Sequence, residues 1–294
     1  MTGAAGQATV EWVGAVLLVA VLLFATIAVA GDRLPGGALA RSAVGALLCA
    51  VDGQRCDRVV PPQSATEALY GAEVAALLDR HAPDVYFEDG DFVSLPVDFR
   101  RCRERRCADT IRAGAVHATQ AGLSPVAFTH VVDCRDAAAA RRRGYDCAGA
   151  EGWLYLQYWT YYPESLTHGL GRLGGFHRDD WESLQVRIAP GGEVEARASS
   201  HHGYNGQRGG LASIGSDTGL RPRPAWEPWD GALHVAAGSH AGMTARESGD
   251  SRMIRSRDLV LVPAEPVATA SGARFAVTPP WLKDVWRHPE AMGT

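Results

Sequence analysis

The sequence predicts a mainly β protein: a β-sandwich with few peripheral helices, preceded by one N-terminal transmembrane helix. The first observation behind this prediction is a series of short apolar and aromatic segments, separated by Gly, Pro and Asp. The second is that only one good helical pattern follows the apolar N-terminus. Many short strands with irregular loops favour two packed sheets. The clearest strand segments are residues 152–162, 182–190, 193–202, 232–240, 258–264 and 273–279.

The composition is that of a folded chain with an ordinary core. Of its 294 residues, 46% are hydrophobic and 21% are charged, which is enough apolar material for one main domain with appendages. The formal net charge is only −4. Nucleic-acid binding usually leaves a strongly basic footprint, so we expect no nucleic-acid partner.

The N-terminus carries the strongest signal for location. Residues 10–31 form an apolar run with no charge after Glu11, about as long as the roughly 20 residues that span a bilayer. The stretch GQATVEWVG resembles the prepilin-type signals of bacterial pilins and TadE-like pseudopilins. The resemblance implies cleavage after Gly6, five residues before Glu11; an uncleaved anchor is the alternative. Both predict a single-pass protein of the cell membrane whose main domain is extracytoplasmic.

The chain divides into three parts. Residues 1–31 are the prepilin-like signal and transmembrane helix, residues 32–66 a stalk or linker, and residues 67–288 the β-sandwich domain. A helix is predicted near the start of this domain, because Ser64 and Glu67 have the spacing of a capping box and apolar residues follow at helical intervals. Pro83 ends it.

The six cysteines lie as close neighbours in sequence. An even number of cysteines in an exported chain favours disulfides over metal thiolates. No Cys-x-x-Cys motif occurs, so a zinc ribbon or a thioredoxin-like site is not expected. The simplest of the possible connectivities joins each neighbouring pair: Cys49 with Cys56, Cys102 with Cys107, and Cys134 with Cys147.

The stretch GGFHRDDWESLQVRI, residues 174–188, raises a question of chemistry. Alternate residues of a strand point to opposite faces, so Asp180 and Glu182 share the face of Leu184 and Val186. If these apolar residues face the core, two carboxylates point inward as well. Buried carboxylates are costly unless they are paired, hydrogen-bonded or bound to a metal.

Two explanations for the inward carboxylates are open. Together with His177, Asp180 and Glu182 suit a divalent cation with mainly oxygen ligands, such as Ca²⁺, Mg²⁺ or Mn²⁺; Zn²⁺ fits less well because its closed sites prefer Cys and His. The alternative is an internal salt bridge with Arg178, with Arg187 or with an arginine from another strand.

Four polar clusters in order, YWTYYPES, FHRDDWE, SSHHGYNG and HVAAGSHAG, carry a further resemblance. The first three, with FHRDDWE read as GFHRDDWESLQVRI, resemble the necrosis- and ethylene-inducing-protein-like cytolysins, whose hallmark is Gly-His-Arg-His-Asp-Trp-Glu. At least as close is a resemblance to the vacuolar protein-sorting protein 62 family, carried by LLDRHAPDVYFEDGDFVSLPVDF, YWTYYP, Asp-Trp-Glu and HVAAGSHAG. The resemblance covers about residues 74–243 and implies a β-sandwich. It also implies a divalent-cation site formed by His177, Asp180 and Glu182, with Glu164 as the upstream acid. Phe176 is inserted and Asp179 replaces the second His of the hallmark, so cytolysis does not follow.

The function predicted is recognition. We expect a divalent cation and nearby aromatic residues to bind a glycan or a lipid head group, since aromatic rings suit both. The alternatives are a metal-dependent hydrolase, with Asp179 or His240 as general base, and a minor pilus-associated structural protein. Neither family implies a settled catalytic activity, which favours binding. The candidate ligand-binding residues are Tyr158, Tyr161, Asp179, His201, His202 and His240.

Overall fold

The computed structural model describes residues 64–88, 94–109, 116–166, 176–200, 203–205, 226–244, 251–270 and 272–291. Most of these residues belong to one compact unit, Ala65–Thr294. The predicted signal and transmembrane helix and most of the stalk lie outside the described residues, as do the Cys49–Cys56 pair and His201 and His202. Within the described part, no helix is long and apolar enough to cross a membrane.

The domain is mainly β, as predicted, and its strands form two sheets. The smaller sheet has the order β10-β1-β8-β9, and the larger has the order β11-β2-β3-β4-β5-β6, with β7 paired to β5. The strands of the smaller sheet are β1 (Asp84–Phe87), β8 (Ala232–Val235), β9 (Gly242–Met243) and β10 (Ser251–Ile254). Those of the larger are β2 (Val126–Asp133), β3 (Leu154–Leu166), β4 (Phe176–Ile188), β5 (Val194–Ser200), β6 (Gly203–Tyr204), β7 (Glu227–Pro228) and β11 (Val260–Pro263).

The helices are short and peripheral. The helix predicted from Ser64 onward is two helices, α3 and α4, because Gly71 between them has φ 83°, a conformation that glycine adopts without steric cost. The α-helices are α3 (Ala65–Tyr70), α4 (Ala72–His81), α5 (Arg105–Ala108), α6 (Ala137–Arg142) and α8 (Ala264–Ala270). The 3₁₀ turns are η2 (Cys134–Asp136), η4 (Ser256–Asp258), η5 (Pro280–Leu282) and η6 (Asp284–Trp286).

The larger sheet buries both of its faces. Leu156 of β3 and Leu184 of β4 share one apolar core with Val85 of β1, so the two sheets meet in that core. On the opposite face, Trp159 and Trp181 pack with residues near the C-terminus such as Trp286. Burial on both faces explains why β3 and β4 are apolar or aromatic at positions of both parities.

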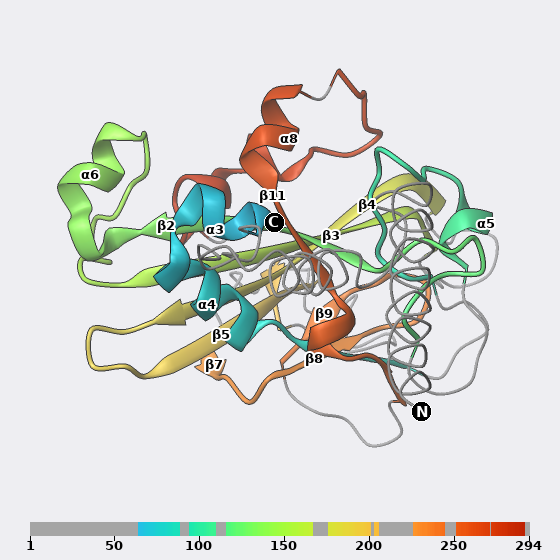
Figure 1. Cartoon of the computed structure of the whole chain (residues 1–294), viewed down its shortest axis with the longest axis horizontal. Coiled ribbons are helices and arrows are strands. Elements are labelled where there is room, and N and C mark those ends of the chain that lie inside the picture. Colours follow the sequence, from blue (N-terminus) through green and yellow to red (C-terminus); the bar gives the residue numbers. More distant parts are fainter. Residues whose placement is uncertain are drawn as a thin grey trace, which may run out of the picture. The chain divides into compact units, whose positions relative to one another are not determined.

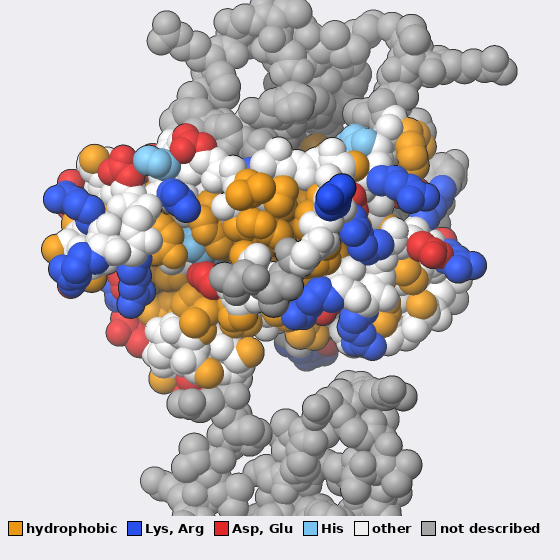
Figure 2. All heavy atoms as spheres, turned by 90° about the horizontal axis from the view of Figure 1, so that it is seen from above, with side chains coloured by type: hydrophobic (Ala, Val, Ile, Leu, Met, Phe, Trp, Pro, Cys, Tyr) orange, Lys and Arg blue, Asp and Glu red, His pale blue; other side chains and the backbone are white. Residues whose placement is uncertain are grey.

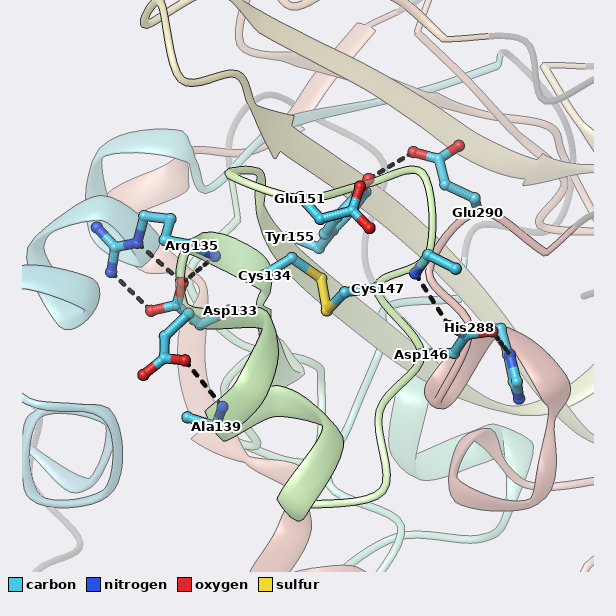
Figure 3. Close-up of a disulfide and its surroundings, with 12 residues drawn as sticks. Asp133, Cys134, Arg135, Ala139, Asp146, Cys147, Glu151, Tyr155, His288 and Glu290 are labelled. Carbon is cyan, nitrogen blue, oxygen red and sulfur yellow. Dashed lines mark hydrogen bonds and ion pairs between the residues drawn. A yellow bond between two sulfur atoms is a disulfide. The ribbon is translucent and has the colours of Figure 1, made fainter.

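The long antiparallel pair β3 and β4 gives the domain two distinct ends. Figure 1 shows α5 near one end of this pair and α6 near the other. The α6 end is closed by the predicted disulfide Cys134–Cys147, beside which Asp146 meets His288 at 3.2 Å (Figure 3). Cys102–Cys107, also predicted, lies at α5. The described residues contain no free cysteine.

Candidate functional site

The inward carboxylates lie where β4 enters the sheet from the α5 end. Asp180 pairs with Tyr162 of β3, and Glu182 pairs with Thr160. Their alternation with Leu184 is the predicted one, because Leu184 and Tyr162 both belong to the core between the sheets. Asp180 is only 7% exposed. Both acids therefore occupy the core-facing side of the strand at its polar end.

Asp180 is hydrogen-bonded to a histidine from the smaller sheet. Its Oδ2 lies 2.9 Å from Nδ1 of His240, and the His240 ring stacks on Tyr162 with the ring centres 3.8 Å apart. His240 lies in the turn between β8 and β9 and has φ 57°, which is uncommon outside glycine. The adjacent Gly238 carbonyl accepts a hydrogen bond from the Leu166 N–H, which fixes this turn against the end of β3.

Glu182 has the most unusual electrostatic environment in the site. Burial raises the pKa of its carboxyl well above the usual value, the neighbouring Asp180 raises it further, and a hydrogen bond donated by the Ser199 hydroxyl only partly opposes this. Lys283 is a nearby cation. Burial lowers the pKa of its ammonium group, and the negative charges of Glu182 and Asp180, which favour the protonated form, offset this only in part. Its Nζ lies 5.5 Å from the centre of the Trp159 ring.

Asp179 is engaged in a different set of contacts. Its Oδ1 accepts hydrogen bonds from Tyr161 at 2.6 Å and from Arg103 at 2.8 Å, and its Oδ2 accepts one from the Ala276 N–H at 2.8 Å. Burial would raise the pKa of this carboxyl, but these hydrogen bonds outweigh it and hold the pKa below the usual value. Asp179 has φ 58° and lies across from Pro163, whose missing N–H interrupts the ladder.

The other two predicted metal ligands face other partners. His177 Nδ1 lies 3.0 Å from the backbone oxygen of Asp179, and Glu164 forms an ion pair with Arg105 at 3.1 Å. The described residues contain no group of three or more His, Cys, Asp or Glu side chains arranged to hold a metal ion. Of the four predicted ligands, Asp180 and Glu182 are the two that share the core-facing side of β4; the metal site stays a prediction.

A small pocket is lined by His240, the hydrogen-bond partner of Asp180. Its volume is about 30 Å³, roughly the space of one water molecule. It is lined by Ser94, Arg105, Asp109, Glu164, Leu166, Gly238 and His240. The structure therefore brings His240 and Glu164 to one pocket, although they lie far apart in the sequence.

The predicted aromatic residues are more deeply placed than expected. Tyr158 is buried and donates its hydroxyl to the Leu78 carbonyl at 2.8 Å, and Tyr161 is buried against Asp179. Sequence reasoning did not identify the roles of Arg103 and Lys283. The one available signal for Lys283 was that it is the only lysine in the chain. Arg103 lies among other arginines, and nothing in its spacing indicated Asp179 as its partner.

Comparisons with known proteins give only a distant likeness. No protein-family model matches the chain, and no curated protein matches it. A solved structure described as "Toxin fold for microbial attack and plant defense" is similar at 14% identity, with a TM-score of 0.40, over 73% of this chain and 87% of the other. "NLPPya in complex with glucosamine" is similar at 17% identity, with a TM-score of 0.38, over 77% and 89%. "NLPPya in complex with mannosamine" is similar at 16% identity, with the same TM-score and coverage.

Proposed function

We propose that this chain is a membrane-anchored, extracytoplasmic β domain that binds a divalent cation at Asp180 and Glu182 and recognises a glycan or a lipid head group beside it. The carrying observation is geometric: Asp180 and Glu182 lie two residues apart on the core-facing side of β4, where burial and the neighbouring Asp180 raise the pKa of Glu182. Two adjacent acids are stabilised either by a proton or by a cation. Ca²⁺, Mg²⁺ and Mn²⁺ suit these oxygen donors.

The position of the acid pair supports recognition at the α5 end. Asp180 is linked through His240 to the small pocket, and Glu164 and Arg105 lie on the same pocket. The pocket has room for a water molecule and not for a sugar ring. A sugar or a head group would therefore meet its acidic and basic side chains from outside, where they can donate to and accept from hydroxyl groups. The membrane anchor is supported by the apolar run of residues 10–31, which is about as long as a helix that spans a bilayer.

Calorimetric titration of the full chain with Ca²⁺, Mg²⁺ and Mn²⁺ tests the cation. We expect binding to strengthen as pH rises, because Glu182 must lose its proton before it can act as a ligand. Asp180→Asn and Glu182→Gln should each weaken binding by about tenfold or more, since losing even a residue that only supports a ligand weakens metal binding by about 10- to 100-fold. Glu151→Gln, an exposed acid of the β2–β3 connection, is the matched control and should bind as the wild type does. A titration that shows no heat of binding for any of the three ions would overturn the cation proposal.

A metal-dependent hydrolase is the second candidate, and one observation favours it. The hydrogen bond from His240 Nδ1 to Asp180 orients an imidazole at the pocket, an arrangement suited to a general base. Asp179 is less suited to that role, since both of its oxygens already accept hydrogen bonds. Hydrolysis of ester or glycoside substrates that is lost in His240→Gln but kept in Asp179→Asn would favour the enzyme over the binding protein.

A further inference from the structure

An arginine-rich surface surrounds the α5 end of the domain. We name it the arginine rim and define it by the exposed or half-buried residues Arg100, Arg101, Arg103, Arg105, Arg106, Arg178 and Arg274. Figure 2 shows basic side chains gathered at both ends of the face that it views, and Figure 1 places α5 at the right-hand end. In the sequence the rim comes from three separate segments, so only the fold assembles it.

Specific contacts hold these three segments together. Arg103 bonds Asp179, next to Arg178 in β4, and its Nη2 also donates to the Arg274 carbonyl at 2.8 Å. Arg105 forms an ion pair with Glu164, which lies across from Arg178 in the β3–β4 pairing. The disulfide Cys102–Cys107 closes the loop that carries Arg103, Arg105 and Arg106. The rim is thus tied to the sheet at several points, which lowers the conformational entropy lost when it binds a ligand.

The charges of this end do not cancel. The described acids that neighbour the rim are already in ion pairs: Asp98 with Arg100, Glu104 with Arg106, Asp109 and Glu164 with Arg105, and Asp179 with Arg103. Arg101, Arg178 and Arg274 are exposed and form no ion pair with any described residue. Within the described part of the chain, three guanidinium groups therefore remain unpaired and can meet an anionic partner next to the small pocket.

We propose that the arginine rim binds an acidic glycan, whose carboxylates pair with Arg101, Arg178 and Arg274. Guanidinium groups match carboxylates with two parallel hydrogen bonds. A bilayer surface would be expected to meet several exposed apolar side chains as well. Among the described residues of this end, Phe176 is the one large exposed hydrophobic side chain; Leu69, Val260 and Leu282 lie in other elements. One aromatic ring suits the face of a sugar.

This inference rests on the glycan recognition proposed above and specifies the glycan as acidic. It does not depend on the cation. The carboxylates would bind at arginines, whereas the cation is assigned to Asp180 and Glu182. The two claims can therefore fail separately.

The test measures binding of the full chain to polygalacturonate, with neutral dextran as the reference polymer. The variant Arg101→Gln/Arg178→Gln/Arg274→Gln removes the three unpaired charges. The matched control is Arg141→Gln/Arg142→Gln/Arg143→Gln, which removes three exposed arginines without ion pairs among the described residues, at the α6 end. We expect the rim variant to bind about tenfold more weakly at low salt, at two- to threefold per exposed charge contact, and the control to bind as the wild type does.

Wild-type binding should also weaken as salt rises from about 0.05 M to about 0.3 M, while the rim variant should lose most of this salt dependence. Equal losses in the rim variant and in the control would show general charge attraction and would overturn the proposal. So would an absence of polygalacturonate binding. Tighter binding to phosphatidylglycerol vesicles that is lost in the rim variant and kept in the control would also overturn it, because it would assign the rim, and not only the N-terminal anchor, to a membrane. Rim-dependent binding in Glu182→Gln would uphold the rim whatever the result of the cation titration.

Discussion

Replacing Asp179 by Asn, at the start of β4, tests how much the negative charge of this side chain contributes to stability, because Asn tolerates the same backbone conformation. Asp179 holds together three parts of the domain: Tyr161 of β3, Arg103 of the disulfide loop, and the Ala276 N–H. Its φ of 58° is a conformation that Asn tolerates as well as Asp does. The substitution therefore removes the negative charge and one strong acceptor without adding strain.

The expected loss in the free energy of unfolding follows from the contacts that Asp179 makes. A hydrogen bond to a charged group contributes about 1.5–3 kcal/mol, and Asn keeps one acceptor oxygen for one or two of the three donors. Arg103 is 37% exposed, so solvent screening reduces the contribution of its ion pair. We expect the free energy of unfolding to fall by about 2 kcal/mol. In a domain of this size that lowers Tm by about 4–8 °C.

The loss of stability in Asp179→Asn should depend on pH in a defined direction. The pKa of Asp179 is lowered in the folded state, so its stabilisation is fully present above the unfolded value of about 3.9 and is lost as pH falls through the folded value. The wild type should therefore exceed Asp179→Asn in stability at pH 7, and the difference should shrink below about pH 4.

Thermal unfolding of the full chain between pH 3 and pH 8, followed by circular dichroism, measures this difference. Asp136→Asn is the matched control, because Asp136 is an exposed cap whose side chain accepts from the Ala139 N–H and Asn caps equally well. Equal stability of Asp179→Asn and wild type at pH 7 would refute the reasoning. Weaker cation binding in Asp179→Asn would instead show that Asp179 is itself a ligand.

Three further predictions concern other parts of the chain. Replacing Cys134 and Cys147 by Ser opens a 13-residue loop and should cost about 3 kcal/mol, measured by urea unfolding. Without divalent cations, Glu182→Gln should raise Tm at pH 7–8 and change it little near pH 4, because the wild type loses stability as pH rises through the raised pKa of Glu182; an unchanged Tm at pH 8 would contradict this. Terminal sequencing of the membrane-extracted protein should find Gln7 first, after cleavage at Gly6; Met1 would indicate an uncleaved anchor.

Much of the larger sheet could be predicted from local pattern. The alternation through Leu184 and Val186 places Asp180 and Glu182 on the core side, and the two testable disulfides join the predicted neighbours. The helix break at Gly71 was not predicted from the pattern, because helical periodicity continues on both sides of it. An isolated glycine is tolerated inside many helices.

The partners of the site residues depended on contacts between distant segments. Asp179 and Asp180 are neighbours with nearly identical sequence surroundings. One meets Arg103 and Tyr161, and the other meets His240 from the smaller sheet. Successive residues of a strand point to opposite faces, so adjacent acids meet different parts of the fold.

By itself, the sequence determined most of the strands, the inward direction of the acid pair and two of the cysteine pairs, because each depends on residues close together along the chain. The prediction of a strand over residues 273–279 was wrong, since these residues form no strand. Only the tertiary structure decided that His240 would orient Asp180, that Lys283 would lie near Glu182, and that separated arginines would form one rim. Those juxtapositions depend on how the two sheets and the C-terminal segment pack. Packing is set by the shape and burial of the whole core, and no local pattern encodes it.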